Sequence, residues 1–149
     1  GFTMTGEDGI VLVRAASIWT LMDTKKHCPS RLTQELQAGY EMGEKPVMDY
    51  APRKIALLGE TQIKEQFKVR KFQIDSNRHM NNVVYVKLAM EALPEDIKIR
   101  ELRVEYKKPA FLGDEVITAV VSVEDKYQVV LQNPAGDIYS VVEFSVSER

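Results

Sequence analysis

Residues 81–93 read NNVVYVKLAMEAL, and the fold prediction starts from this stretch. Asparagine is a favoured helix cap, and the proline at position 94 cannot continue a helix. Apolar residues fall almost all the way round a helix drawn through the stretch: Val83, Val84, Val86, Leu88, Ala89, Met90 and Leu93. A helix that is apolar on all sides is typically enclosed by the rest of its domain. We therefore predict a buried helix over residues 81–93.

Strand patterns flank the predicted helix on both sides. Before it, residues 67–74 form one candidate strand, whose apolar positions switch from odd to even numbers and so predict a bulge. After it, apolar residues alternate with polar ones or run continuously in four segments: residues 102–106, 115–123, 127–132 and 138–146. This order of a strand, a helix and four strands predicts an α+β fold, in which an antiparallel sheet wraps around one central helix.

The first part of the chain has a different pattern. Residues 2–5 and 10–22 are rich in strand-forming residues and flank a Gly-Glu-Asp-Gly turn, which predicts a hairpin. Apolar residues then repeat at helical spacing over residues 30–42. One hairpin and one helix cannot enclose a core of their own. We therefore divide the chain into three parts: residues 1–45, a linker over 46–61 and a domain over 62–149.

Composition excludes several classes of function. The formal net charge of the 149 residues is −2, which argues against bulk nucleic-acid binding. No apolar stretch approaches the roughly 20 residues that cross a bilayer, so no membrane span is expected. Cys28 is the only cysteine and there are two histidines, so neither an intrachain disulfide nor a metal site is expected. We also expect no cofactor.

The residues with catalytic potential precede the predicted helix. Asp75, Asn77 and His79 stand at positions i, i+2 and i+4, and in an extended segment this spacing places three side chains on one side. Asn81 and Asn82 then open the helix, where the first backbone N–H groups lack intrahelical partners and stabilise negative charge. A carboxylate, an amide and an imidazole would thus meet beside a site suited to an oxyanion.

The pattern D-x-N-x-H-x-N-N-x-x-Y, from Asp75 to Tyr85, resembles the signature of the acyl-acyl-carrier-protein (acyl-ACP) thioesterases of plants and bacteria. Other segments resemble the same family: residues 16–23, 53–55, 102–106 and 113–114. The resemblance implies a hot-dog fold, present as two tandem domains in the full protein. On this interpretation residues 1–45 are the C-terminal remnant of the first hot dog with a connecting helix, and residues 62–149 are the second.

The resemblance also implies roles for these residues. Asp75, Asn77 and His79 match the family's catalytic residues by position. We expect Asp75 to act as general base or nucleophile, Asn77 to position the water or the carbonyl, and His79 to orient the acid or shuttle the proton. The backbone N–H groups near Asn81 and Asn82 are candidates for the oxyanion hole. Tyr85 either packs in the core or lines the pocket.

The sequence departs from the family at one place. The family commonly carries a Glu, and in plants a Cys, after the Tyr-basic-basic run, whereas here residues 106–108 are followed by Pro109 and Ala110. Neither residue can act as acid, base or nucleophile. The expected function is hydrolysis of fatty acyl-ACP in fatty acid biosynthesis. Two alternatives are an acyl-CoA thioesterase and a catalytically weak acyl-binding or assembly module.

Basic residues are concentrated in two segments. Residues 64–78 and 98–108 each contain five basic and two acidic residues. Because acyl carrier proteins are strongly acidic, we expect Arg78, Lys107 and Lys108 to help dock the carrier, with an ordinary solvated strand face as the alternative. We further expect a homodimer or tandem hot-dog pairing, in the cytoplasm of a bacterium or the plastid of a plant.

Overall fold

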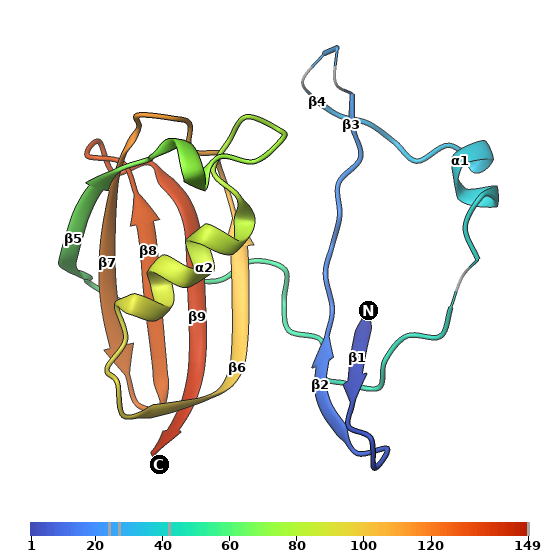
Figure 1. The fold of residues 1–149 in the computed structure, drawn as a ribbon, viewed down its shortest axis with the longest axis horizontal. Helices are drawn as coiled ribbons and strands as arrows, with labels where there is room; N and C mark the ends of the chain where they lie inside the picture. Colours follow the sequence, from blue (N-terminus) through green and yellow to red (C-terminus); the bar gives the residue numbers. More distant parts are fainter. Residues whose placement is uncertain (24, 27, 42, 149) are drawn as a thin grey trace. The chain divides into compact units, whose positions relative to one another are not determined.

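The computed structural model describes residues 1–23, 25, 26, 28–41 and 43–148. The chain divides into two compact units, Gly1–Ala51 and Pro52–Arg149, which are drawn in Figure 1 and treated separately here. Among the described residues, no helix has both the length and the apolar character that crossing a membrane requires.

The first unit begins with the predicted hairpin. Strand β1 (Phe2–Thr5) pairs antiparallel with β2 (Val11–Ala15). Gly9 in the connecting turn has φ +79°, a conformation that glycine adopts without steric cost. The second strand ends at Ala15, so the prediction of a strand over residues 10–22 is wrong beyond that residue. Two short strands, β3 (Met22–Asp23) and β4 (Cys28–Pro29), form a separate antiparallel pair.

The helix of the first unit is shorter than predicted. Helix α1 covers Gln34–Ala38, and the side chain of Thr33 caps it by accepting a hydrogen bond from the Leu36 N–H. Met42, the last residue of the predicted helix, lies outside the described residues. None of the described residues of this unit is buried, and Trp19 is 84% exposed. The assignment of this unit to the end of another domain remains a prediction.

The second unit contains a five-stranded antiparallel sheet (Figure 1). The spatial order is β5-β7-β8-β9-β6. The bounds of the strands are β5 (Gln62–Lys68), β6 (Ile97–Tyr106), β7 (Glu115–Val123), β8 (Lys126–Gln132) and β9 (Ile138–Glu148). Helix α2 (Asn82–Glu91) lies across one face of this sheet. The predicted α+β architecture, with one helix and four later strands, is confirmed.

Two details of the prediction are wrong. Strand β5 ends at Lys68, and a short 3-10 helix follows over Lys71–Gln73, so the change of apolar phase marks the end of the strand rather than a bulge within residues 67–74. Helix α2 is not enclosed on all sides by the described chain either. It buries Tyr85 and Ala89 against the sheet, whereas Val83 is 58% and Met90 48% exposed.

The face of the sheet opposite α2 is covered by a strap, which we define as residues 52–58. Four side-chain-to-backbone hydrogen bonds hold it: Glu105 accepts from the Ile55 N–H (2.9 Å), Gln128 donates to the Ala56 carbonyl (2.9 Å) and accepts from the Leu58 N–H (3.1 Å), and Arg103 donates to the Pro52 carbonyl (2.8 Å). Beneath it, Arg103 also pairs with the buried Glu143 at 2.7 Å. Part of the predicted linker therefore packs with the second unit.

Candidate active site

The catalytic residues expected from the sequence lie on a tight loop, not on an extended strand. Ile74 and Met80 pair as an isolated antiparallel bridge and close the loop at its base. Within it, the Asp75 N–H donates to the His79 carbonyl (3.0 Å). Arg78 has φ +64°, the left-handed conformation that turns the chain back. The predicted extended geometry is therefore wrong, because the chain reverses between residues 75 and 79.

This reversal brings a carboxylate and an imidazole together. The Nδ1 atom of His79 lies 3.9 Å from Oδ1 of Asp75, and the two side chains are 32% and 19% exposed. The same Asp75 oxygen accepts a hydrogen bond from the Asn77 backbone N–H at 2.8 Å, and Nδ1 of His79 lies 3.3 Å from the Met80 carbonyl oxygen. The acid is thus fixed from its own loop while remaining accessible to solvent.

Asn77 is placed differently from the prediction. Its backbone contacts Asp75, but the residue as a whole is exposed at the outside of the loop. An i, i+2, i+4 set shares one side only in extended backbone. The loop therefore brings Asp75 and His79 together, whereas Asn77 contacts Asp75 through its backbone N–H.

The two asparagines at the start of α2 have different environments. The side chain of Asn81 caps the helix by accepting from the Val83 N–H (2.9 Å), and its own N–H donates to the Gln73 carbonyl (2.9 Å). The Asn81 N–H is therefore not free to bind an oxyanion. Within the described chain the Asn82 N–H makes no hydrogen bond, and Asn82 is exposed. Asn82 is thus the remaining oxyanion-hole candidate of the pair.

Tyr85 packs in the core. It is 2% exposed, and its hydroxyl oxygen accepts the Ala110 N–H at 2.9 Å. Burial raises the pKa of Tyr85; the Ala110 N–H opposes this effect, and the carboxylates of Asp114 and Asp75 raise the pKa further. The phenol therefore stays protonated near neutral pH.

The segment where the sequence departs from the family lies against the loop. Ala110 is fully buried, and its carbonyl accepts the Met80 N–H at 2.7 Å. The Asp114 carboxylate accepts hydrogen bonds from the Phe111 N–H (2.8 Å) and the Tyr139 hydroxyl (3.4 Å). These bonds fix the turn over residues 111–114. No pattern in the sequence indicated the backbone role of Ala110. Asp114 was indicated only as part of the Gly-Asp pair at residues 113–114, which resembles a segment of the family.

The three expected docking cations differ in their partners. Lys107 lies 3.4 Å from Glu105, and Lys108 lies 2.9 Å from Asp137. Arg78 is exposed on the loop between Ile74 and Met80 and forms no ion pair with another described residue. Of the three, Arg78 carries the least compensated charge.

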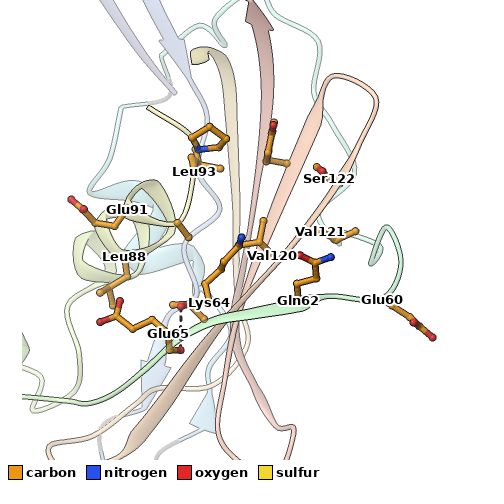
Figure 2. Close-up of a pocket in the computed structure, with 14 residues that line it drawn as sticks. Glu60, Gln62, Lys64, Glu65, Leu88, Glu91, Leu93, Val120, Val121 and Ser122 are labelled. Carbon is orange, nitrogen blue, oxygen red and sulfur yellow. Dashed lines mark hydrogen bonds between the residues drawn. The ribbon is translucent and has the colours of Figure 1, made fainter. Parts of the chain in front are cut away.

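A cavity lies beside the C-terminal end of α2, where Leu88, Glu91 and Leu93 line it (Figure 2). It has a volume of about 700 Å³, and its lining includes Leu88, Leu93, Val120 and Glu65. A smaller cavity of about 390 Å³ is lined by Gln66, Phe67, Lys68 and Glu115. Neither is lined by Asp75 or His79. No group of three or more metal-binding side chains occurs in the parts of the chain that the structure describes.

The sheet with one helix across it is a hot-dog fold, and solved structures share it. An acyl-ACP thioesterase from Bacteroides thetaiotaomicron matches with a TM-score of 0.66 at 14% identity, over 85% of this chain and 53% of that one. The 12:0-ACP thioesterase from Umbellularia californica matches with a TM-score of 0.72 at 19% identity, over 86% of this chain and 52% of that one.

The family model described as the acyl-ACP thioesterase C-terminal domain matches residues 58–143, so the chain belongs to the acyl-ACP thioesterase family. The chloroplastic palmitoyl-acyl carrier protein thioesterase of Cuphea hookeriana is 28% identical over an alignment of 110 residues, and the match covers 67% of this chain. The chain spans about a quarter of the length of that relative, since the match covers 26% of it.

Proposed function

We propose that the protein hydrolyses fatty acyl thioesters carried on acyl carrier protein, releasing a free fatty acid and the carrier with its thiol, in fatty acid biosynthesis. The observation that carries this proposal is the 3.9 Å approach of His79 Nδ1 to Asp75 Oδ1. The pair adjoins a helix N-terminus that leaves the Asn82 N–H free among the described residues. Membership of the acyl-ACP thioesterase family supports the substrate class.

In the proposed mechanism Asp75 is the general base. Its carboxylate takes a proton from a water molecule while the water oxygen attacks the thioester carbonyl carbon. The carbonyl electron pair moves to oxygen, and the Asn82 N–H donates to the resulting oxyanion. The intermediate then collapses, the carbon–sulfur bond breaks, and the thiolate takes up the proton held by Asp75. A general base and an oxyanion donor each contribute about 10²- to 10³-fold or more.

His79 and Asn77 support this step. His79 keeps the acid oriented and can relay the proton to the leaving sulfur. The exposed amide of Asn77 meets the water or the carbonyl from the solvent side of the loop. In a second route Asp75 attacks the thioester directly, and water then hydrolyses the mixed anhydride.

Docking of the carrier protein is proposed to centre on Arg78. Carrier proteins are acidic, and an uncompensated guanidinium on the catalytic loop would attract them toward the site. Lys107 and Lys108 extend the basic surface, although each already has an acidic neighbour. The contribution of Arg78 should therefore be the largest of the three.

One observation favours a second function, a catalytically weak acyl-binding or assembly module. The family carries a Glu or a Cys after the Tyr-basic-basic run, whereas here that run is followed by Pro109 and Ala110. Ala110 is fully buried, and neither residue can act as acid, base or nucleophile. An acyl-CoA thioesterase would use the same Asp75 and His79, and it differs from the leading proposal only in the carrier.

The pairing and the compartment also belong to the proposal. The exposed apolar face of α2, with Val83 and Met90, fits coverage by another hot dog, either in tandem or in a second copy. The Cuphea hookeriana relative is chloroplastic. A plastid is proposed for a plant source and the cytoplasm for a bacterial one.

Turnover of acyl-ACP and acyl-CoA by the full-length protein tests the proposal. Hydrolysis of acyl-ACP at a higher kcat/KM than acyl-CoA of the same chain length supports the leading function. A higher kcat/KM for acyl-CoA supports the alternative of an acyl-CoA thioesterase. Tight binding of acyl-ACP without turnover supports the acyl-binding module.

A further inference from the structure

A chain of hydrogen bonds joins a buried tyrosine to the base of the catalytic loop. Tyr85 comes from the first turns of α2 and points into the core, where its hydroxyl oxygen accepts the Ala110 N–H at 2.9 Å. The carbonyl of the same Ala110 accepts the Met80 N–H at 2.7 Å. Ala110 is thereby held on one side by the helix and itself holds the residue that follows His79.

Met80, which this attachment holds, is also one of the two residues at the base of the loop. Met80 pairs with Ile74, and these two residues flank the loop on its two sides. The Asn81 N–H also joins the two flanks, by donating to the Gln73 carbonyl (2.9 Å), and two further backbone bonds lie inside the loop, between Asp75 and His79 and between Arg78 and Asp75. A shift of Met80 would therefore move His79 relative to Asp75, whose present separation is 3.9 Å.

The hydroxyl is the one group that a phenylalanine at position 85 would lack. Since its oxygen accepts a hydrogen bond, its own hydrogen remains to be donated. Burial raises the pKa of Tyr85, and the charges of Asp114 and Asp75 raise it further, so the hydroxyl keeps its hydrogen near neutral pH. A phenylalanine would fill the same space but would leave the Ala110 N–H without this acceptor.

We propose that Tyr85 is a positioning residue of the active site, which holds the loop of Asp75 and His79 against the start of α2 through the backbone of Ala110. This inference rests on the proposed hydrolysis at Asp75. It explains a buried polar contact that core packing alone does not require, because the apolar ring would pack equally well without its hydroxyl.

The test is the Tyr85→Phe substitution in the full-length protein, assayed with acyl-ACP. We expect kcat to fall roughly ten- to a hundredfold, as small misplacements of catalytic groups cause, with KM changed less than about twofold. Tyr127→Phe is the matched control. Tyr127 is half-buried on β8, and its hydroxyl has no hydrogen-bond partner in the described chain, so kcat should be unchanged.

A second measurement separates positioning from loss of stability. In Tyr85→Phe the Met80 amide should exchange its hydrogen faster, while the Val142 amide in the core keeps its protection. Folded Tyr85→Phe with wild-type kcat, or with unchanged exchange at Met80, would overturn the inference. Asp75→Asn distinguishes failure of this inference from failure of the proposed function. If Asp75→Asn and Tyr85→Phe both hydrolyse acyl-ACP at the wild-type rate, the proposed function is wrong. If Asp75→Asn abolishes turnover and Tyr85→Phe does not lower it, the proposed function stands and the positioning role of Tyr85 is wrong.

Discussion

The Nδ1 atom of His79 lies 3.9 Å from the Oδ1 atom of Asp75, across a loop whose two ends are paired through Ile74 and Met80. The distance is longer than a hydrogen bond, and contacts of this kind commonly shorten when substrate binds. Both side chains are partly exposed, so solvent water can reach them.

His79→Gln should separate the orienting role from the proton-relay role. A glutamine can still hydrogen-bond to Asp75 but cannot carry a proton, so we expect kcat for acyl-ACP to fall roughly 10²-fold with little change in KM. Steady-state kinetics checks this result. Full activity of His79→Gln would mean that the imidazole only orients its neighbour.

Reversal of the charge on Arg78 should weaken docking of the carrier. Arg78→Glu is expected to raise KM for acyl-ACP at low salt and to leave KM for acyl-CoA nearly unchanged, because only the protein carrier is a large acidic partner. Arg100→Glu is the matched control, since Arg100 pairs with Asp125 near the opposite end of the sheet. Equal effects of Arg78→Glu on both substrates would remove the docking proposal.

Loss of the Glu105 contact should release the strap of residues 52–58. The pKa of Glu105 is lowered overall: burial raises it, but the hydrogen bond from the Ile55 N–H and the nearby Lys107 outweigh that effect. A lowered pKa means that the stabilisation is present at neutral pH and is lost as pH falls below the ordinary range of a glutamate. Glu105→Gln should therefore be less stable than wild type at pH 7 and similar to it in acid.

Urea unfolding at the two pH values measures this difference, and limited trypsin digestion measures the strap itself. Cleavage after Arg53 and Lys54 should be faster in Glu105→Gln at pH 7. A control substitution, Glu101→Gln, changes an exposed glutamate of the same strand and should have no effect. Unchanged cleavage in Glu105→Gln would show that the remaining bonds hold the strap alone.

Alkaline pH should destabilise the second unit through its tyrosines. Burial is the largest cause that raises the pKa of Tyr85, Tyr106 and Tyr139. The folded state therefore keeps protons that the unfolded chain loses near pH 10, so stability is complete below about pH 10 and falls as pH rises beyond it. Tyrosinate absorbance should rise together with loss of circular dichroism. Early ionisation of every tyrosine in the folded state would contradict this account.

The sequence identified those parts of the fold that depend on local pattern. Period-two alternation and a turn rich in Gly, Pro and Asn are sufficient to predict the pairing of β8 with β9 around residues 133–137. Asparagine caps likewise predict the start of α2, where Asn81 is the cap. These features need no knowledge of distant residues.

Other features depend on contacts between distant segments, and the sequence could not reveal them. The loop of residues 74–80 is attached to a distant segment by the bond between Met80 and Ala110, and the strap is bound by side chains 50 or more residues away in the chain. The composition of α2 suggested complete burial, yet a single sheet can enclose only one side of a helix. Asp75 and His79 were identified correctly as neighbours, but through a turn rather than through extended spacing.

The rate of fatty acid release from acyl-ACP by Asp75→Asn tests the central claim most directly. Asparagine keeps the size of the side chain and removes the base, so kcat should fall by about 10²-fold or more while the melting temperature stays close to that of wild type. Asp125→Asn, a surface change of the same kind, should retain full activity. Hydrolysis by folded Asp75→Asn at the wild-type rate would contradict the account.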